Sequence, residues 1–135
     1  MLLLDSSVWI DIQRGQITPA TQFALEQESR QQLALTECIY LEVMQGAKNE
    51  QSAKNLHRDL AGQIVLAPHG LETYALAAEL YRKARSIGLT IRSTIDCLVA
   101  AQALENHCIL LHSDRDFFAL QKVAPDLVIY PAVLH

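Results

Sequence analysis

The chain has 135 residues, of which 50% are hydrophobic and 19% are charged, and its formal net charge is −4. This length suits one compact unit, so we expect residues 1–135 to form a single domain with one core. The acidic balance argues against binding nucleic acid through overall positive charge. The apolar runs are far shorter than the roughly 20 residues that cross a bilayer, and residues 1–5 lack the basic start of a signal peptide. We therefore expect a cytoplasmic protein without a membrane segment.

The cysteines and histidines do not follow metal-binding patterns. Cys38, Cys97 and Cys108 are odd in number, show no CxxC spacing and lie in apolar contexts. We expect buried thiols, because a disulfide or a zinc site needs paired or closely spaced cysteines. The histidines form no HxxxH or HExxH pattern, so His107 and His112 are interpreted as packing or surface residues.

Short apolar runs alternate with helical segments in the first half of the chain. Residues 2–4 predict a strand that ends at Asp5, and Ser6 and Ser7 favour a helix N-terminus directly after it. Thr18 and Thr36 are further expected N-caps, the first followed by proline at the first helical position. The expected helices run to residue 15, from 20 to about 30, and from 36 to 46, with a second strand at 33–35.

The second half continues the same alternation. Residues 49–60 are polar and too poor in apolar positions to predict a core helix, whereas 64–67 predict a strand. Residues 71–87 have apolar side chains near helical spacing and form the longest predicted amphipathic helix. The run Ser93-Thr94-Ile95-Asp96 matches a capping box before a helix that is apolar nearly all round and therefore buried. Two further strands are expected at 109–112 and 128–130.

Short apolar strands without polar alternation are typical of parallel sheets covered on both faces. Interleaved with helices, they predict an α/β three-layer domain with a central sheet of four or five strands. In such sheets ligands bind beyond the carboxyl ends of the strands. Acidic side chains at those ends are therefore the first candidates for a functional site.

Four acidic residues are expected to meet at this edge. Asp5 and Asp114 follow strands, while Asp96 and Glu42 lie on helices that open toward the same edge. Carboxylates gathered in this way repel one another unless a cation compensates them. Oxygen ligands without histidine or cysteine suit Mg²⁺, with Mn²⁺ as a substitute, and a bound ion of this kind activates water against a phosphodiester. Taken singly, each acid also fits an ordinary helix-cap or surface role.

Other polar residues are assigned supporting roles. Asp116 is either an auxiliary acid of the site or a first-turn helix acid that interacts with the helix dipole. The hydroxyls of Ser6 and Ser113 either bond the metal-binding acids or satisfy backbone donors. Basic side chains near the acidic motifs are candidates for contacting RNA phosphates, although those of the long helix also fit a solvated face; the candidates are Arg14, Arg85, Arg92 and Arg115.

Four segments of the chain resemble, in order, the motifs of PIN-domain VapC toxins, the ribonuclease halves of VapBC toxin–antitoxin pairs. They are LLDSSVWID at 3–11, YLEVMQGA at 40–47, TIDCLVAA at 94–101 and LLHSDRDF at 110–117. The resemblance spans nearly the whole chain and places one acid in each motif. Serine stands at positions 6 and 113, where threonine is frequent in the family, so both positions keep a hydroxyl.

The resemblance implies a PIN-like fold and Mg²⁺-dependent endoribonuclease activity in a type II toxin–antitoxin pair. It also implies that Asp5, Glu42, Asp96 and Asp114 bind the metal with Asp116 as an auxiliary. The expected partners are an RNA substrate, a second copy of the chain and a VapB-like antitoxin. The antitoxin would place an arginine or lysine in the acidic groove, in the position of the metal ion.

Two other interpretations are retained at this stage. A phospho-acceptor receiver domain shares the length and the α/β pattern, but it requires paired early acids and a lysine after a late strand, and neither is present. A PIN-like module that only binds RNA or protein would have lost catalytic acids, yet all four are in place. A dehalogenase-type phosphatase is excluded because Ser6 and Ser7 follow Asp5, leaving no DxD motif.

Overall fold

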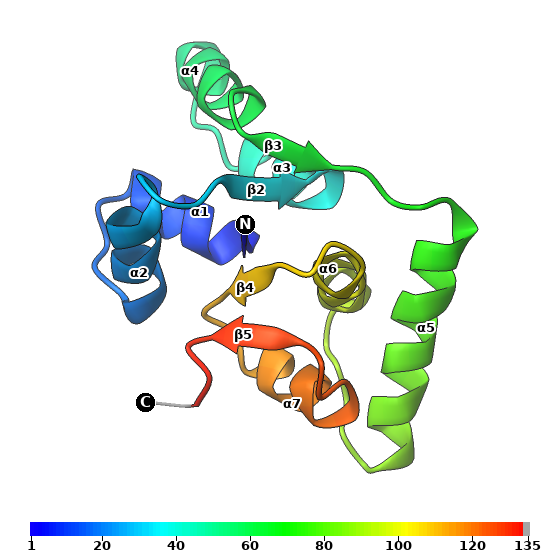
Figure 1. Ribbon diagram of the computed structural model, residues 1–135. Helices are drawn as coiled ribbons and strands as arrows, with labels where there is room; N and C mark the ends of the chain where they lie inside the picture. Colours follow the sequence, from blue (N-terminus) through cyan, green and yellow to red (C-terminus); the bar gives the residue numbers. More distant parts are fainter. Residues whose placement is uncertain (134–135) are drawn as a thin grey trace.

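The computed structural model describes residues 1–133, which form a parallel sheet with helices on both faces (Figure 1). The strands are β1 (Leu2–Leu4), β2 (Leu33–Thr36), β3 (Ile64–Leu66), β4 (Ile109–Leu111) and β5 (Val128–Tyr130). The helices are α1 (Ser6–Gln13), α2 (Pro19–Gln27), α3 (Glu37–Met44), α4 (Glu50–Ala61), α5 (Leu71–Ser86), α6 (Thr94–Glu105) and α7 (Arg115–Val123). The predicted α/β three-layer fold is confirmed, with five strands.

The strand order is β3-β2-β1-β4-β5, and every neighbouring pair is parallel. Leu4 of β1 lies opposite Leu111 of β4, so the two central strands end at the same level. The chain order reverses between β1 and β4, because β2 and β3 extend the sheet to one side and β5 to the other. Open α/β sheets bind ligands at such a switch point, beyond the carboxyl ends of the strands.

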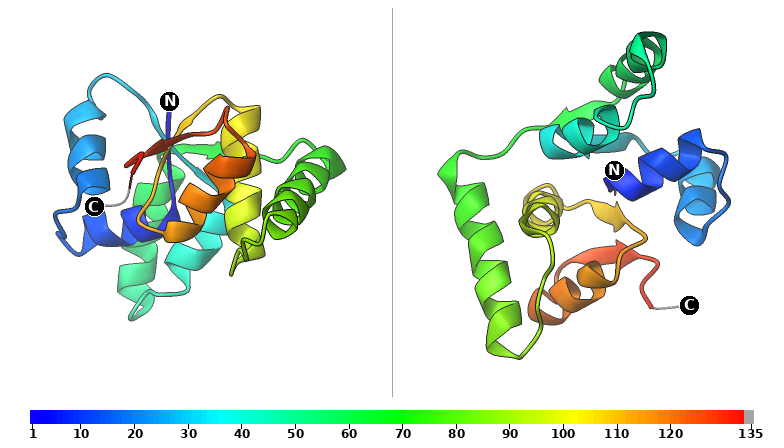
Figure 2. Two further views of the ribbon diagram at one scale, coloured as in Figure 1. Left: turned by 90° about the horizontal axis from the view of Figure 1, so that it is seen from below. Right: turned by 180° about the vertical axis from the view of Figure 1, so that it is seen from behind.

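The helices form two groups on opposite faces of the sheet (Figures 1 and 2). On one face α1 packs against α2 and α3, and α3 against α4; on the other, α5, α6 and α7 pack against one another. Right-handed crossovers explain this division, because connections that move to opposite sides of β1 place their helices on opposite faces. The strands and the inner helix α6 form the core, with Leu3, Leu110 and Val99 fully buried.

Helix α6 is buried on nearly all sides, as its apolar composition predicts. The predicted capping box at its start is wrong: Ser93 occupies the N-cap position but its side chain makes no capping hydrogen bond. The Asp96 backbone N–H donates to the Ser93 carbonyl oxygen at 3.2 Å. Within residues 1–133, no side-chain capping hydrogen bond forms at this helix start, so the Asp96 carboxylate is free for the site.

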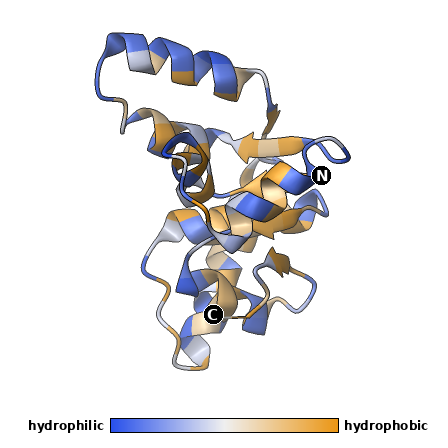
Figure 3. Cartoon of the chain, turned by 90° about the vertical axis from the view of Figure 1, so that its left-hand side faces the viewer, coloured by the Kyte–Doolittle hydropathy of each residue, from blue (hydrophilic) through white to orange (hydrophobic). Residues whose placement is uncertain are grey.

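One other local prediction is corrected, and a segment that we did not expect in the core forms an outer helix. Ser6 and Ser7 are the first helical residues of α1, and Asp5 takes the N-cap position that we expected a serine to fill. The polar segment that did not predict a core helix forms α4, whose N-cap Asn49 accepts the Ser52 backbone N–H at 2.8 Å. Leu60 is its one buried residue, so α4 lies on the outside and is largely hydrophilic (Figure 3).

Among residues 1–133, none of the helices is long and apolar enough to span a membrane. The three cysteines are free; Cys97 and Cys108 are buried as expected, and Cys38 is half-buried.

Candidate metal centre

Asp5 lies where β1 turns into α1. Its backbone N–H donates to the Leu111 carbonyl oxygen at the end of β4, at 3.0 Å, which joins the two strand ends. The Ser7 hydroxyl donates to Oδ2 at 3.3 Å, while Oδ1 is buried and has no hydrogen-bond partner among the described residues. Asp5 is 5% exposed, and burial raises its pKa to about 6, with the charges of Glu42 and Asp114 contributing.

Asp96 is in the first turn of α6 and is 8% exposed. Burial is the main cause that raises its pKa to about 8, and the negative charges of Asp5, Asp114, Asp116 and Glu42 contribute to this rise. The four predicted acids and Asp116 come from separate segments of the chain, and the charges of the other four all act on Asp96 at this edge of the sheet. Near neutral pH, Asp96 binds a proton unless another cation takes its place.

Asp114 and Asp116 stand at the start of α7. Asp114 is the N-cap, and its Oδ1 accepts the Asp116 backbone N–H at 2.9 Å. Asp114 therefore caps the helix and Asp116 lies in its first turn, and both residues also belong to the acidic cluster. One carboxylate oxygen from each of Asp96, Asp114 and Asp116 lies within 4.8 Å of the other two.

His112 holds the backbone of Asp114 through a hydrogen bond, a role that its sequence context did not indicate. The ring is fully buried and lies against Phe117 and Phe118, with centroids 5.3 and 4.9 Å away. The Asp114 backbone N–H donates to Nδ1 at 3.2 Å, so Nε2 carries the hydrogen and donates to the Pro131 carbonyl oxygen at 3.0 Å. Burial lowers the pKa of His112, which favours this neutral tautomer.

The residues of this cluster fit a hard divalent cation. The donors are carboxylate oxygens, three of them close enough to share one ion, and Asp5 Oδ1 is a buried acceptor without a donor. An orphaned buried carboxylate oxygen is costly, and a cation at this position would remove that cost. Burial is the main cause that raises the pKa values of Asp5 and Asp96, neighbouring negative charges add to it, and a bound cation would oppose both effects.

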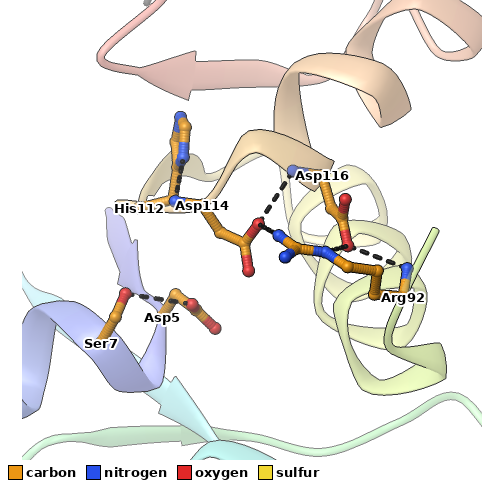
Figure 4. Close-up of polar contacts among 6 residues, drawn as sticks. All are labelled: Asp5, Ser7, Arg92, His112, Asp114 and Asp116. Atoms are coloured by element: carbon orange, nitrogen blue, oxygen red, sulfur yellow. Dashed lines mark hydrogen bonds and ion pairs between the residues drawn. The ribbon is translucent and has the colours of Figure 1, made fainter.

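The hydroxyls expected to assist the acids are placed differently. Among the described residues, neither Ser6 nor Ser113 uses its side chain to bond a carboxylate, and Ser113 is exposed. Ser7 makes that contact with Asp5 (Figure 4). The backbone N–H of Ser6 also bonds Asp5 and lowers its pKa in part. Ser6 and Ser7 are adjacent in the sequence, and only the three-dimensional structure shows that the Ser7 hydroxyl is the one that bonds the Asp5 carboxylate.

The candidate phosphate-binding arginines are dispersed. Arg92 reaches the cluster, with Nη2 3.2 Å from Asp114 Oδ1 and Nε 3.6 Å from Asp116 Oδ2 (Figure 4). Arg115 is exposed and directly follows Asp114. Arg85 lies in the last turn of α5, with its guanidinium 5.9 Å from the Tyr81 ring centroid. Arg14 is at the opposite end of α1 from Asp5, beside a hollow between α1, α3 and α4.

Comparison with known proteins agrees with this architecture. Residues 2–123 match the PIN domain family. The chain is 32% identical over 125 residues to VapC ribonuclease Mb1587 of Mycobacterium bovis and to ribonuclease VapC11 of Mycobacterium tuberculosis, covering 91% of this chain and 93% of each relative. The chain therefore belongs to the PIN domain family and, within it, to the VapC ribonucleases, which makes it a nuclease.

Solved structures show the same fold at lower identity. VapBC-1 from nontypeable Haemophilus influenzae aligns with a TM-score of 0.73 at 18% identity, over 95% of each chain. FitAcB from Neisseria gonorrhoeae aligns with a TM-score of 0.70 at 22% identity, over 96% of each chain. The receiver-domain alternative is set aside, because receivers have the strand order 2-1-3-4-5 and this sheet has β3-β2-β1-β4-β5.

The raised pKa of Asp96 predicts how stability depends on pH in the metal-free protein. The folded chain holds a proton on Asp96 up to a pKa of about 8, whereas the unfolded chain loses it near 3.8. The free energy of unfolding should therefore fall as the pH rises between these values. Asp96→Asn should remove most of this slope and gain more than about 1 kcal/mol over the wild type at high pH.

Urea unfolding in EDTA, at a series of pH values, measures this difference. The two proteins should have similar stability near pH 4 and diverge as the pH rises. If the free energies of unfolding of the two proteins differ by the same amount at every pH, the folded protein does not raise the pKa of Asp96.

Proposed function

We propose that this acidic cluster binds Mg²⁺, or Mn²⁺ in its place, and hydrolyses RNA phosphodiesters as the toxin of a type II toxin–antitoxin pair in the cytoplasm. The observation that carries the proposal is the convergence of buried carboxylates at the β1–β4 switch point, with Asp5 Oδ1 unpartnered among the described residues. A bound divalent ion supplies Lewis acidity there and lowers the pKa of a coordinated water.

Each acid has a distinct task under this proposal. Asp96 and Asp114 hold the ion with the nearest oxygens, and Asp5 contributes its buried Oδ1. Glu42, which is half-buried on α3, adds negative charge from the other side of the sheet edge and stands as a further ligand. Asp116 assists either as a ligand or by anchoring the loop before α6, since its Oδ2 accepts the Arg92 backbone N–H at 2.9 Å.

RNA would be held by the basic groups nearest the cluster. Arg92 pairs with Asp114 and Arg115 directly follows it, so these two arginines are the first candidates for contacting RNA phosphates. Arg85 adds charge at the end of α5. Arg14 lies too far along α1 to contact the same phosphate, and we assign it to more distant RNA or to the partner.

Removing the charge of Asp96 tests the catalytic assignment. Asp96→Asn should abolish RNA cleavage while the protein stays folded, because one ligand is lost from a cluster that repels itself. Asp126→Asn, an exposed acid before β5, is the matched control and should cleave normally. EDTA should silence the wild type, and added Mg²⁺ or Mn²⁺ should restore cleavage. Full activity in Asp96→Asn, or activity that survives thorough chelation, would remove the metal mechanism.

The partner is proposed to be a VapB-like antitoxin whose C-terminal tail places an arginine or lysine among the carboxylates. Solved structures with this fold include a toxin–antitoxin complex and two VapBC structures. The acidity of the site supports such an inhibitor, because a cationic side chain would satisfy the same oxygens that attract a metal.

This arrangement predicts competition between the tail and the metal. Calorimetric affinity of the C-terminal antitoxin peptide should fall as Mg²⁺ rises, and fall more than in a salt control of equal ionic strength. Asp114→Asn should weaken both the peptide and the metal, because each uses the same carboxylate. A peptide affinity that ignores Mg²⁺ in both proteins would place the tail elsewhere.

A homodimer is the remaining proposal about assembly. Helix α5 exposes Leu71 and Tyr74, its C-cap Ile87 is also exposed, and Tyr74 borders a hollow of 390 Å³ between α5 and α6. Exposed apolar side chains gathered on one helix favour a symmetric contact. Trp9 of α1 offers no comparable surface, because it is 6% exposed and belongs to the core.

Light scattering tests this surface. The wild type should run as a dimer at micromolar concentration and Tyr74→Glu as a monomer, since a charge would be buried in the contact. Gln22→Glu, an equal charge change on exposed α2, should leave the dimer intact. A wild type that is monomeric under these conditions would contradict the proposal.

A further inference from the structure

Arg92 is a positively charged side chain inside the proposed metal site. It lies in the loop between α5 and α6, and its guanidinium contacts two carboxylates, Asp114 Oδ1 at 3.2 Å and Asp116 Oδ2 at 3.6 Å (Figure 4). Both acids belong to the group of three whose oxygens approach one another most closely. Two of the three closest ligands thus already share a cation supplied by the chain.

The loop does not depend on this guanidinium for its position. The Arg92 backbone N–H separately donates to Asp116 Oδ2 at 2.9 Å, so the main chain is fastened to the cluster whatever the side chain is. The side chain itself is 71% exposed. It can therefore turn toward solvent without uncovering an apolar surface or breaking the backbone bond.

Arg92 also leaves most of the negative charge uncompensated. Its guanidinium pairs with Asp114 and Asp116, and among the described residues it forms no ion pair with the buried carboxylates of Asp5 and Asp96. Among residues 1–133, the other basic side chains that form ion pairs do so away from the cluster. A divalent ion placed among all the carboxylates would satisfy them better than one monovalent group at their edge.

We propose that Arg92 is an internal counter-cation that exchanges with the metal. In the metal-free protein it holds Asp114 and Asp116; when the ion binds, the guanidinium is released and meets an RNA phosphate at the same edge. This inference rests on the proposed metal site. It links metal binding to RNA binding, because the arginine becomes available to phosphate only after the carboxylates have another partner.

Metal affinity gives the primary test. Arg92→Gln removes the competitor but keeps the backbone bond to Asp116, so Mn²⁺ should bind roughly two- to fivefold more tightly by calorimetry, the range expected for a partly exposed ion pair. Arg115→Gln is the matched control, since it removes the same charge beside Asp114 without removing an ion pair seen in the described structure. Its gain in Mn²⁺ affinity should be clearly smaller, because water screens an unpaired charge.

RNA affinity gives an independent readout that requires no cleavage. Anisotropy of a labelled 2′-O-methyl RNA oligomer should show Arg92→Gln binding several-fold more weakly than the wild type in Mg²⁺, and nearly equally in EDTA. In the wild type, the Nε–Hε NMR signal of Arg92, assigned by its absence from Arg92→Gln, should move as Mg²⁺ is added.

The outcomes separate the two proposals. If the wild type binds no Mn²⁺, the metal site itself is refuted. If the wild type binds Mn²⁺ but Arg92→Gln binds it no more tightly than Arg115→Gln, the exchange is refuted and the metal site stands. An equal loss of RNA affinity with and without Mg²⁺ would also refute the exchange, since Arg92 would then meet phosphate whether or not metal is bound.

Discussion

The repulsion among carboxylates at the β1–β4 edge is the constraint around which this molecule is organised. Parallel pairing of β1 and β4 brings Asp5 and Asp114 to the same edge of the sheet, and α6 adds Asp96 from the face that it covers. Folding buries these carboxylates close to one another, which is unfavourable for their charged forms and raises the pKa values of Asp5 and Asp96. A bound cation would stabilise the charged carboxylates and so offset this unfavourable energy.

The surrounding backbone partly offsets this charge. Asp5 and Asp114 occupy the N-cap positions of α1 and α7, and Asp96 lies in the first turn of α6. Three helix N-termini therefore direct their partial positive charge toward the same acids. Capping and ligand binding are not exclusive roles here. Asp114 fastens the start of α7 through one oxygen and still faces the other acids.

The neighbours that position the acids come from distant parts of the chain. His112 fixes the Asp114 backbone while bonding Pro131 after β5, and the loop before α6 brings Arg92 to Asp114 and Asp116. These contacts join the segments that follow β4 and β5 to the loop before α6. They hold the carboxylates at a spacing that a divalent ion, an arginine of the chain or a cationic side chain of a partner can each satisfy.

From the sequence alone one could predict the α/β class, the strands, most helices and a gathering of acidic side chains at one edge of the sheet, because apolar periodicity, strand ends and motif order are local patterns. It could not show that Ser7 and not Ser6 reaches Asp5, that His112 supports Asp114, or that Arg92 lies among the carboxylates. It also left α4 uncertain, since a helix with one buried residue has little apolar signal. These features depend on side chains that meet only after the sheet has formed and the loops have packed at its edge. Tertiary structure decided them because distance in space, and not spacing along the chain, sets which charges and hydrogen-bonding groups meet.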